Sequence, residues 1–178
     1  MREIVLPEAK PAFEWVNGRA VQKVTPKRRH SLAQTEFDAA LLEWARTYGT
    51  GMVGTEWRFR VKPQGEDRRP LVPDVAFLSY RRMPYKEQQR TEEPDIAPDI
   101  VVEVLSPGDL RIDISEKIRV YLKAGTEAVF LVDPKKQIVT VYERGDKCIL
   151  GADDVIEHPT LPRFRLAVRK LFSLPQPK

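Results

Sequence analysis

The chain has 178 residues, of which 42% are hydrophobic, and its formal net charge is +4. This length suits one domain with a real core, so we expect a single domain over residues 1–178. No apolar run reaches membrane-spanning length, and the N-terminus lacks the apolar centre of a signal peptide. One cysteine and two histidines argue against a zinc site and favour a reducing cytoplasm. The basic charge suits a polyanionic partner but does not require one.

The first predicted elements are a β-hairpin and a long helix. Two runs with strand character, residues 13–16 and 19–24, flank Asn17-Gly18, and Asn-Gly between such runs is the strongest short hairpin signal. Residues 31–48 show apolar side chains at helical spacing along one face, and glycines follow the last of them. The chain is therefore expected to open with a hairpin that leads into an amphipathic helix.

The central third is predicted to contain two strands and a long connection. Residues 53–61 alternate between apolar and charged side chains and predict one strand, with a polar loop over 62–70 after it. A short strand follows over 73–78. Residues 79–98 form a charged, proline-containing connection, and a loop this long in a compact domain is usually functional or disordered. A lid, a dimer arm and a disordered loop are all open interpretations of this segment.

The last third predicts a strand, a helix and a second strand, over residues 99–105, 109–124 and 127–133. Such a unit normally pairs its strands in parallel through a right-handed crossover. A turn leads to a further strand over 138–143, and the tail over 161–172 predicts a strand and a short helix. Together with the opening hairpin, these elements predict an α/β chain of the α+β kind, with a mixed sheet flanked by helices.

Two charged residues fall where apolar ones are expected. Glu103 lies in the middle of an apolar strand, and a buried charge is costly unless a partner pairs with it. At roughly 100° per residue, Asp113 and Lys117 fall inside the apolar arc of the following helix. The leading hypothesis is a site built from acids and a lysine. The alternatives are a buried structural ion pair and a simple helix pair between Asp113 and Lys117.

Asp74 opens the strand that precedes Glu103 in the chain. If the two strands are neighbours, the two carboxylates can converge on one hard cation, and magnesium favours one or two carboxylates plus waters. Such a metal activates water and polarises phosphate, while a nearby lysine offsets transition-state charge. The pattern therefore indicates metal-dependent phosphodiester hydrolysis. The alternative for Asp74 is that it only caps a strand. Asp99 follows a second proline and lies a full pleat from Glu103, so we expect it to have a structural role.

Several other residues are weaker candidates. Glu36 lies at the edge of the first helix's apolar arc, so it could join a metal site or lie on the surface. Short basic clusters are usually solvated surface, but they could also contact phosphates. The candidate phosphate contacts are Arg58, Arg60, Arg81 and Arg82.

Several motifs of the chain, taken together and in their order along the sequence, resemble those of the Uma2 family of restriction endonuclease-like proteins. The resemblance spans nearly the whole chain. It is carried by Pro73-Asp74-Val75, by Pro98-Asp99 with Glu103-Val104-Leu105-Ser106-Pro107, by Asp113 and Lys117 four residues apart, and by Leu131-Val132-Asp133-Pro134. Weaker support comes from Phe13-Glu14, His30 and the tail from Leu161 to Phe172. The resemblance implies a restriction endonuclease-like core of the PD-(D/E)XK nuclease superfamily.

The resemblance also implies a site that uses Mg²⁺ or Mn²⁺ to hydrolyse DNA. Asp74 matches the first acid of the family and Glu103 the second, and both would hold the metal. The usual lysine position, two residues after the second acid, is Leu105 here, so Lys117 would supply the amine. In our interpretation of the site, Asp113 orients Lys117 or adds an outer-shell contact.

The implied substrate is double-stranded DNA, and cutting both strands suggests a homodimer. A non-catalytic nucleic-acid-binding module and a partner-binding protein on the same scaffold are the alternatives.

Overall fold

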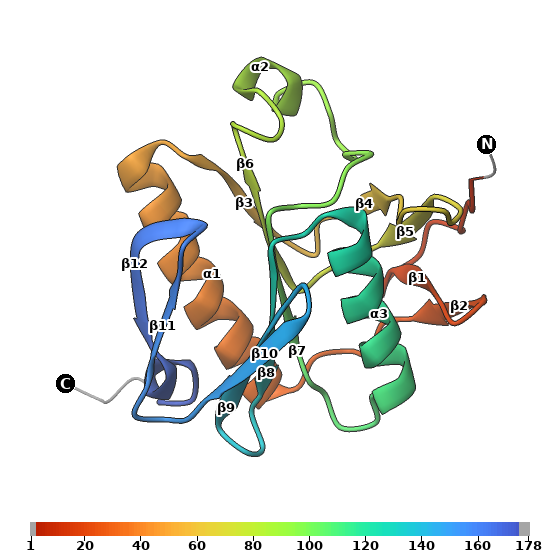
Figure 1. Ribbon diagram of the computed structural model, residues 1–178. Helices are drawn as coiled ribbons and strands as arrows, with labels where there is room; N and C mark the ends of the chain where they lie inside the picture. Colours follow the sequence, from red (N-terminus) through yellow and green to blue (C-terminus); the bar gives the residue numbers. More distant parts are fainter. Residues whose placement is uncertain (1–2, 175–178) are drawn as a thin grey trace.

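The computed structural model describes residues 3–174, and its centre is a six-stranded sheet in the order β10-β9-β8-β7-β6-β3 (Figure 1). The strands are β3 (Gly51–Thr55), β6 (Val75–Ser79), β7 (Ile100–Val104), β8 (Ala128–Asp133), β9 (Ile138–Glu143) and β10 (Asp146–Leu150). β7 and β8 pair in parallel, and every other neighbouring pair is antiparallel. The predicted mixed sheet and its parallel strand–helix–strand unit are confirmed.

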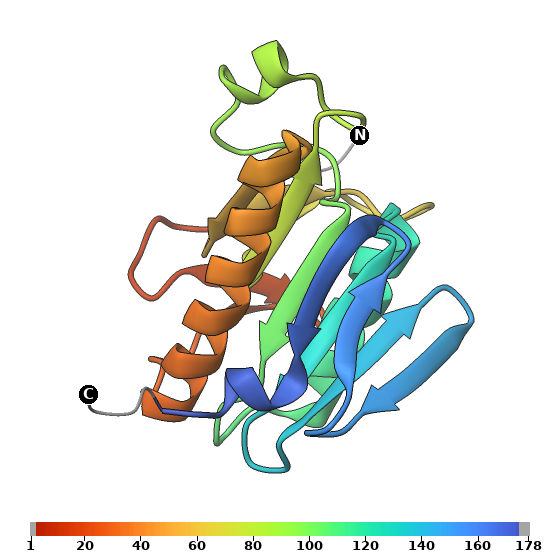
Figure 2. The ribbon, with the colours of Figure 1, turned by 90° about the vertical axis from the view of Figure 1, so that its left-hand side faces the viewer.

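Helices cover both faces of this sheet. α1 (Arg28–Tyr48) lies on one face and α3 (Arg111–Ala124) on the other (Figures 1 and 2). Alternation along β8 explains the two layers, because Phe130 packs in the α1 core while Val129 packs in the α3 core. α1 ends at Gly49, whose φ of 60° is the left-handed conformation that glycine adopts readily.

Three two-stranded ladders complete the fold. They are β1 (Phe13–Val16) with β2 (Arg19–Gln22), β4 (Phe59–Val61) with β5 (Arg69–Leu71), and β11 (Val155–His158) with β12 (Leu161–Ala167). A short 3-10 helix, Val168–Leu171, follows β12. The opening hairpin is confirmed, and it forms its own ladder beside the central sheet rather than extending it.

The prediction of one strand over residues 53–61 is wrong. The chain leaves the central sheet after Thr55, turns at Glu56 with a φ of 49°, and resumes as β4 in a separate ladder. The alternation of side chains continues across this break, so the pattern alone did not reveal it. The predicted polar loop over 62–70 likewise ends inside β5, and β10 and β11 were not predicted.

The long connection between β6 and β7 follows a defined path and contains the short helix α2 (Tyr85–Gln88). Gln88 is buried, and its side-chain amide donates to the carbonyls of Leu78, Ser79 and Met83. At its base, Arg82 contacts the buried Asp99 carboxylate at 3.1 Å. These contacts fix the connection and give Asp99 the structural role that was one interpretation of it. Among residues 3–174, no helix is both long enough and apolar enough to span a bilayer.

Candidate active site

Strand register brings Asp74 and Glu103 together. Val75 of β6 pairs with Val102 of β7 in antiparallel register, so the residue before Val75 meets the residue after Val102. Asp74 accepts a hydrogen bond of 2.7 Å from the Val104 amide, which fixes its carboxylate beside β7. Like charges placed directly across a ladder repel, so this pair needs compensating groups.

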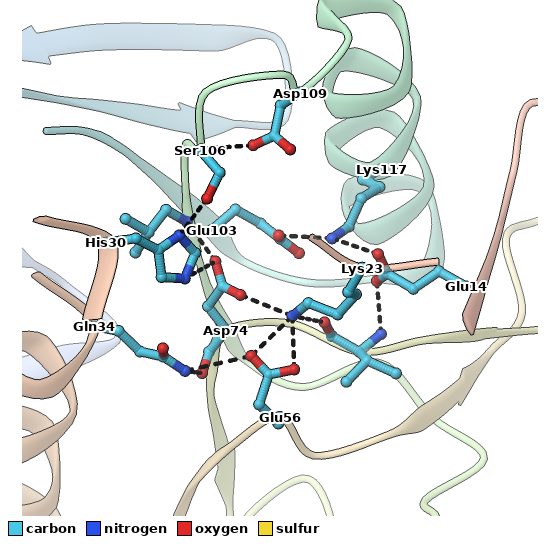
Figure 3. A network of polar contacts seen from close by, with 12 residues as sticks. Glu14, Lys23, His30, Gln34, Glu56, Asp74, Glu103, Ser106, Asp109 and Lys117 are labelled. Carbon is cyan, nitrogen blue, oxygen red and sulfur yellow. Dashed lines mark hydrogen bonds and ion pairs between the residues drawn. The ribbon is translucent and has the colours of Figure 1, made fainter. Parts of the chain in front are cut away.

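Lys117 provides one compensating charge. It lies on the inward face of α3 with 5% of its surface exposed, and its Nζ is 2.6 Å from Glu103 Oε2 (Figure 3). The same Nζ is 3.0 Å from Glu14 Oε2, which comes from β1. Glu14 is itself buried and accepts 2.8 Å from the Val72 amide. Lys117 therefore lies between two carboxylates from different elements.

Lys23, just after β2, provides the second compensating charge. Its Nζ is 2.7 Å from Asp74 Oδ1, 2.9 Å from Glu56 Oε2 and 2.8 Å from the Val72 carbonyl. The turn at Glu56, which ends β3, places that carboxylate next to Lys23 (Figure 3). The hairpin thus contributes an acid and a cation to the same cluster.

α1 contributes polar groups from a third direction. His30 is buried in its first turn, with Nε2 3.6 Å from Asp74 Oδ2 and Nδ1 2.9 Å from Ser106 Oγ. Gln34, one turn later, donates 2.9 Å to the Asp74 carbonyl. Asp74 is therefore held on both its side chain and its backbone (Figure 3).

Burial and charge shift the two acids in opposite directions. Burial by itself would raise the pKa of Asp74, but the Lys23 ammonium and the His30 hydrogen bond outweigh it and hold that pKa well below its ordinary range. Burial raises the pKa of Glu103 to about 8, with Lys117 opposing the shift and Asp74 and Glu14 adding to it. Burial also disfavours the Lys117 ammonium, but the carboxylates of Glu103 and Glu14 raise its pKa above the ordinary value.

The donor set fits a divalent cation. The cluster holds four carboxylates and two ammonium groups, so an excess of two negative charges remains when all are ionised: Glu14, Glu56, Asp74, Glu103, Lys23 and Lys117. Glu103 Oε1 is buried and makes no hydrogen bond of good geometry within residues 3–174, while the buried Tyr121 hydroxyl interacts with the same carboxylate. A carboxylate oxygen is a hard ligand, and a buried oxygen without a good hydrogen bond needs an explanation.

The same part of the chain contains no preformed cage of three or more acid, histidine or cysteine ligands.

Asp113 lies in the same pocket, a cavity of about 230 Å³, but it binds the hairpin. Its carboxylate accepts 2.8 Å from the Asn17 amide and 2.6 Å from Arg19. It therefore ties the β1–β2 turn to α3 and does not contact Lys117. Glu36 is not brought to the cluster, because it lines a different groove beside Trp44.

All four predicted phosphate-contacting arginines have acidic partners within the chain. Arg58 pairs with Glu8 and Glu93, Arg60 with Glu3, and Arg82 with Asp99 and Glu127. Arg81 is 77% exposed and is 3.8 Å from Asp99. These arginines lie on β4, beside it and at the base of the α2 connection rather than around the acidic cluster.

Sequence reasoning missed Glu14, Lys23 and Glu56 as members of the cluster. A signal existed for Glu14, because it shares a strand face with Val16, and both are buried. Alternation along the hairpin could therefore have placed its side chain inward. No comparable signal marks Lys23 or Glu56, whose positions depend on how the hairpin docks.

Comparisons with known proteins identify the family and the fold. The Uma2 family model, described as "Putative restriction endonuclease", matches residues 4–169. A crystal structure of "a putative nuclease belonging to DUF820" from Anabaena variabilis is similar with a TM-score of 0.83 and 28% sequence identity, covering 94% of this chain and 93% of that chain. No curated protein matches the chain. With its nuclease-like sheet and a match over nearly all its length, this chain belongs to the Uma2 family.

Proposed function

We propose that the protein is a magnesium-dependent endonuclease that hydrolyses phosphodiester bonds of double-stranded DNA. One observation carries the proposal. Buried Asp74 and Glu103 lie together on neighbouring strands, in a cluster with more negative charge than Lys23 and Lys117 neutralise. The family and the similar nuclease structure support the same reaction class.

In this proposal Asp74 and Glu103 hold Mg²⁺ or Mn²⁺, with Glu14 close by on the other side of Lys117. When bound, such a metal polarises a phosphate oxygen and lowers the pKa of a coordinated water. The side chain of Lys117 orients the attacking water and offsets charge in the transition state. Glu14 acts as a positioning residue, since its contact with Nζ fixes that ammonium next to Glu103.

Asp113 acts indirectly, because it holds in place the hairpin that carries Glu14 and is followed by Lys23. Cutting both strands of a duplex requires two such sites, so we propose that the active form is a homodimer in the cytoplasm.

A second candidate is a non-catalytic protein on the same scaffold. It is favoured by the extent to which Lys23 and Lys117 already satisfy the acids, because such networks also occur as purely structural elements. A structural network needs no cation and turns over no substrate, so activity separates the two candidates.

The test is nicking of supercoiled plasmid DNA with magnesium by wild type, Glu103→Gln and Lys117→Ala. We expect each variant to lose at least about 10²-fold in rate, the scale of removing one electrostatic contact to a transition state. Glu157→Gln is the matched control, since Glu157 pairs with Arg165 far along the chain on β11 and β12. Equal nicking by all four proteins, or none by wild type, would reject the proposal.

A further inference from the structure

A large groove lies beside the pocket of the candidate active site and extends to the turn between β8 and β9. Its volume is about 970 Å³, and it shares the lining residues His30, Ser106, Asp109 and Ile114 with the site pocket, so the two pockets lie next to each other. Both views of the fold place the start of α1, the β7–α3 loop and the β8–β9 turn at the same end of the molecule (Figures 1 and 2). We call the large groove the basic groove because of six lining side chains: Lys27, Arg28, Arg29, Arg111, Lys135 and Lys136.

The six cations are free to meet a ligand. All six residues are exposed, and within residues 3–174 none of these side chains forms an ion pair or a hydrogen bond. The two acids that line the groove accept bonds from backbone amides instead, Asp109 from Ser106 at 2.7 Å and Asp133 from the amides of the β8–β9 turn at 3.0 Å. The groove thus keeps a marked excess of positive charge, unlike the surface around Arg58 and Arg82, where acids neutralise each arginine.

The charges at the start of α1 are unfavourable for a helix, because they are cations where acids are preferred. Lys27 is the residue before the first turn and Arg28 and Arg29 begin it, while that turn contains no acid and no side-chain cap. Cations at this end meet the positive pole of the helix dipole and lower its stability. A sequence that accepts such a local cost usually does so for a function. Phosphate bound at the same place would remove the cost, since helix N-termini favour anions.

We propose that the basic groove holds the phosphate backbone of duplex DNA and leads it to the acidic cluster. The inference rests on the proposed function and adds the path that the substrate takes. Charge complementarity selects a polyanion, and the position of the groove beside the site pocket selects one whose phosphates are the reacting groups.

The side chains that line the basic groove favour duplex DNA over single-stranded DNA as the ligand. Tyr142 is the one phenylalanine, tyrosine or tryptophan among the described lining residues, whereas single-strand sites stack successive bases on several aromatic side chains.

The test is binding of a fluorescent DNA duplex in EDTA, where cleavage does not occur, over a series of salt concentrations. The variants are Arg28→Gln with Arg29→Gln, and Lys135→Gln with Lys136→Gln. We expect each double variant to weaken binding by roughly tenfold, about equally for unrelated sequences, and to reduce the slope of log affinity against log salt by about 2. The control is Lys86→Gln with Arg90→Gln, two exposed cations of the α2 connection that also lack a side-chain partner within the described residues.

The outcomes separate this inference from the proposed function. If both groove variants bind the duplex with wild-type affinity, the proposal that the basic groove binds DNA is wrong, even if wild type nicks plasmid DNA. Weakened binding in the groove variants but not in the control supports the groove, even if wild type never cleaves. Tighter binding of a single strand than of the duplex would overturn the choice of partner. Loss of folding does not confuse the result, because the Arg28 and Arg29 variant should melt at the same temperature as wild type or higher, since it removes cations from the helix start.

Discussion

α3 carries two ionic clusters that differ in charge balance. Its inward face brings Lys117 to the site cluster, where four carboxylates outnumber two ammonium groups in a buried setting. Its outer face brings Glu116, Arg119 and Lys123 to a surface cluster with Glu66 and Arg69, where three cations outnumber two acids. The surface cluster is complete without a ligand, whereas the site cluster lacks positive charge.

The two clusters also treat their acids differently. In the surface cluster, hydrogen bonds from Arg119 lower the pKa of Glu66 to about 2. In the site cluster, burial raises the pKa of Glu103 to about 8 even though Lys117 is 2.6 Å away. A short ion pair therefore does not by itself stabilise a carboxylate, because desolvation can exceed the attraction. The contrast is the reason why the site cluster, and not the surface cluster, is the proposed metal site.

The largest expected effect comes from removing the central cation of the site cluster. Lys117→Met leaves Glu14 and Glu103 buried without their ammonium, and we expect the free energy of unfolding to fall by about 3–5 kcal/mol in urea denaturation at pH 7. Lys123→Met is the same change in the surface cluster, where the side chain is 43% exposed, and should cost about 1 kcal/mol or less. Equal losses would mean that burial does not distinguish the clusters.

Metal-linked stability should be next in size. If the site cluster binds Mg²⁺ or Mn²⁺, a metal concentration 100 times the Kd raises the free energy of unfolding by about 2.7 kcal/mol. The increment should be greater at pH 9 than at pH 6, because the metal must displace the proton that Glu103 binds with a pKa of about 8. Thermal melting of wild type with and without metal measures it.

Two variants assign that increment to the site cluster. Asp74→Asn should abolish it and should also destabilise the metal-free protein, because it leaves the buried Lys23 ammonium without its closest carboxylate. Glu66→Gln, which changes the surface cluster instead, should retain the full increment. An increment that survives in Asp74→Asn would contradict the assignment of Asp74 as a ligand.

The smallest expected effect is the acid sensitivity of the surface cluster. Because the pKa of Glu66 falls from 4.5 to about 2 on folding, its contribution is present above pH 4.5 and is lost as the pH falls toward 2. Glu66 is partly exposed, so we expect wild type to exceed Glu66→Gln by about 1 kcal/mol at pH 7, with the difference vanishing near pH 2. Urea denaturation over this pH range measures it, and a difference that persists at pH 2 would contradict the role given to Arg119.

Local sequence patterns predicted the parts of the site that come from the central sheet and α3. Glu103 and Lys117 were identified because each interrupts an apolar pattern, and Asp74 because it precedes a strand next to that of Glu103. The same logic failed for Lys23 and Glu56, since a charge in a polar hairpin or at a strand end has the pattern of a solvated residue. Their burial is decided by the docking of the hairpin, and docking leaves no periodic signal.

The fold was predicted to a similar extent and for similar reasons. The mixed sheet, the hairpin and the two long helices followed from strong periodicity, and their bounds differ from the predicted ones by a few residues. The break after Thr55 was missed because the turn at Glu56 preserves side-chain alternation while the backbone changes ladder. That the chain forms a single domain stays a prediction.

The β1–β2 hairpin pairs with no strand of the central sheet, yet it supplies Glu14 and precedes Lys23 directly. Two of the four charged side chains around Asp74 and Glu103 therefore depend on the position of a hairpin that Asp113 attaches to α3. Substitutions at Asn17 or Arg19 would therefore weaken the attachment of the hairpin and change the site cluster, without altering any residue of the central sheet or of α3.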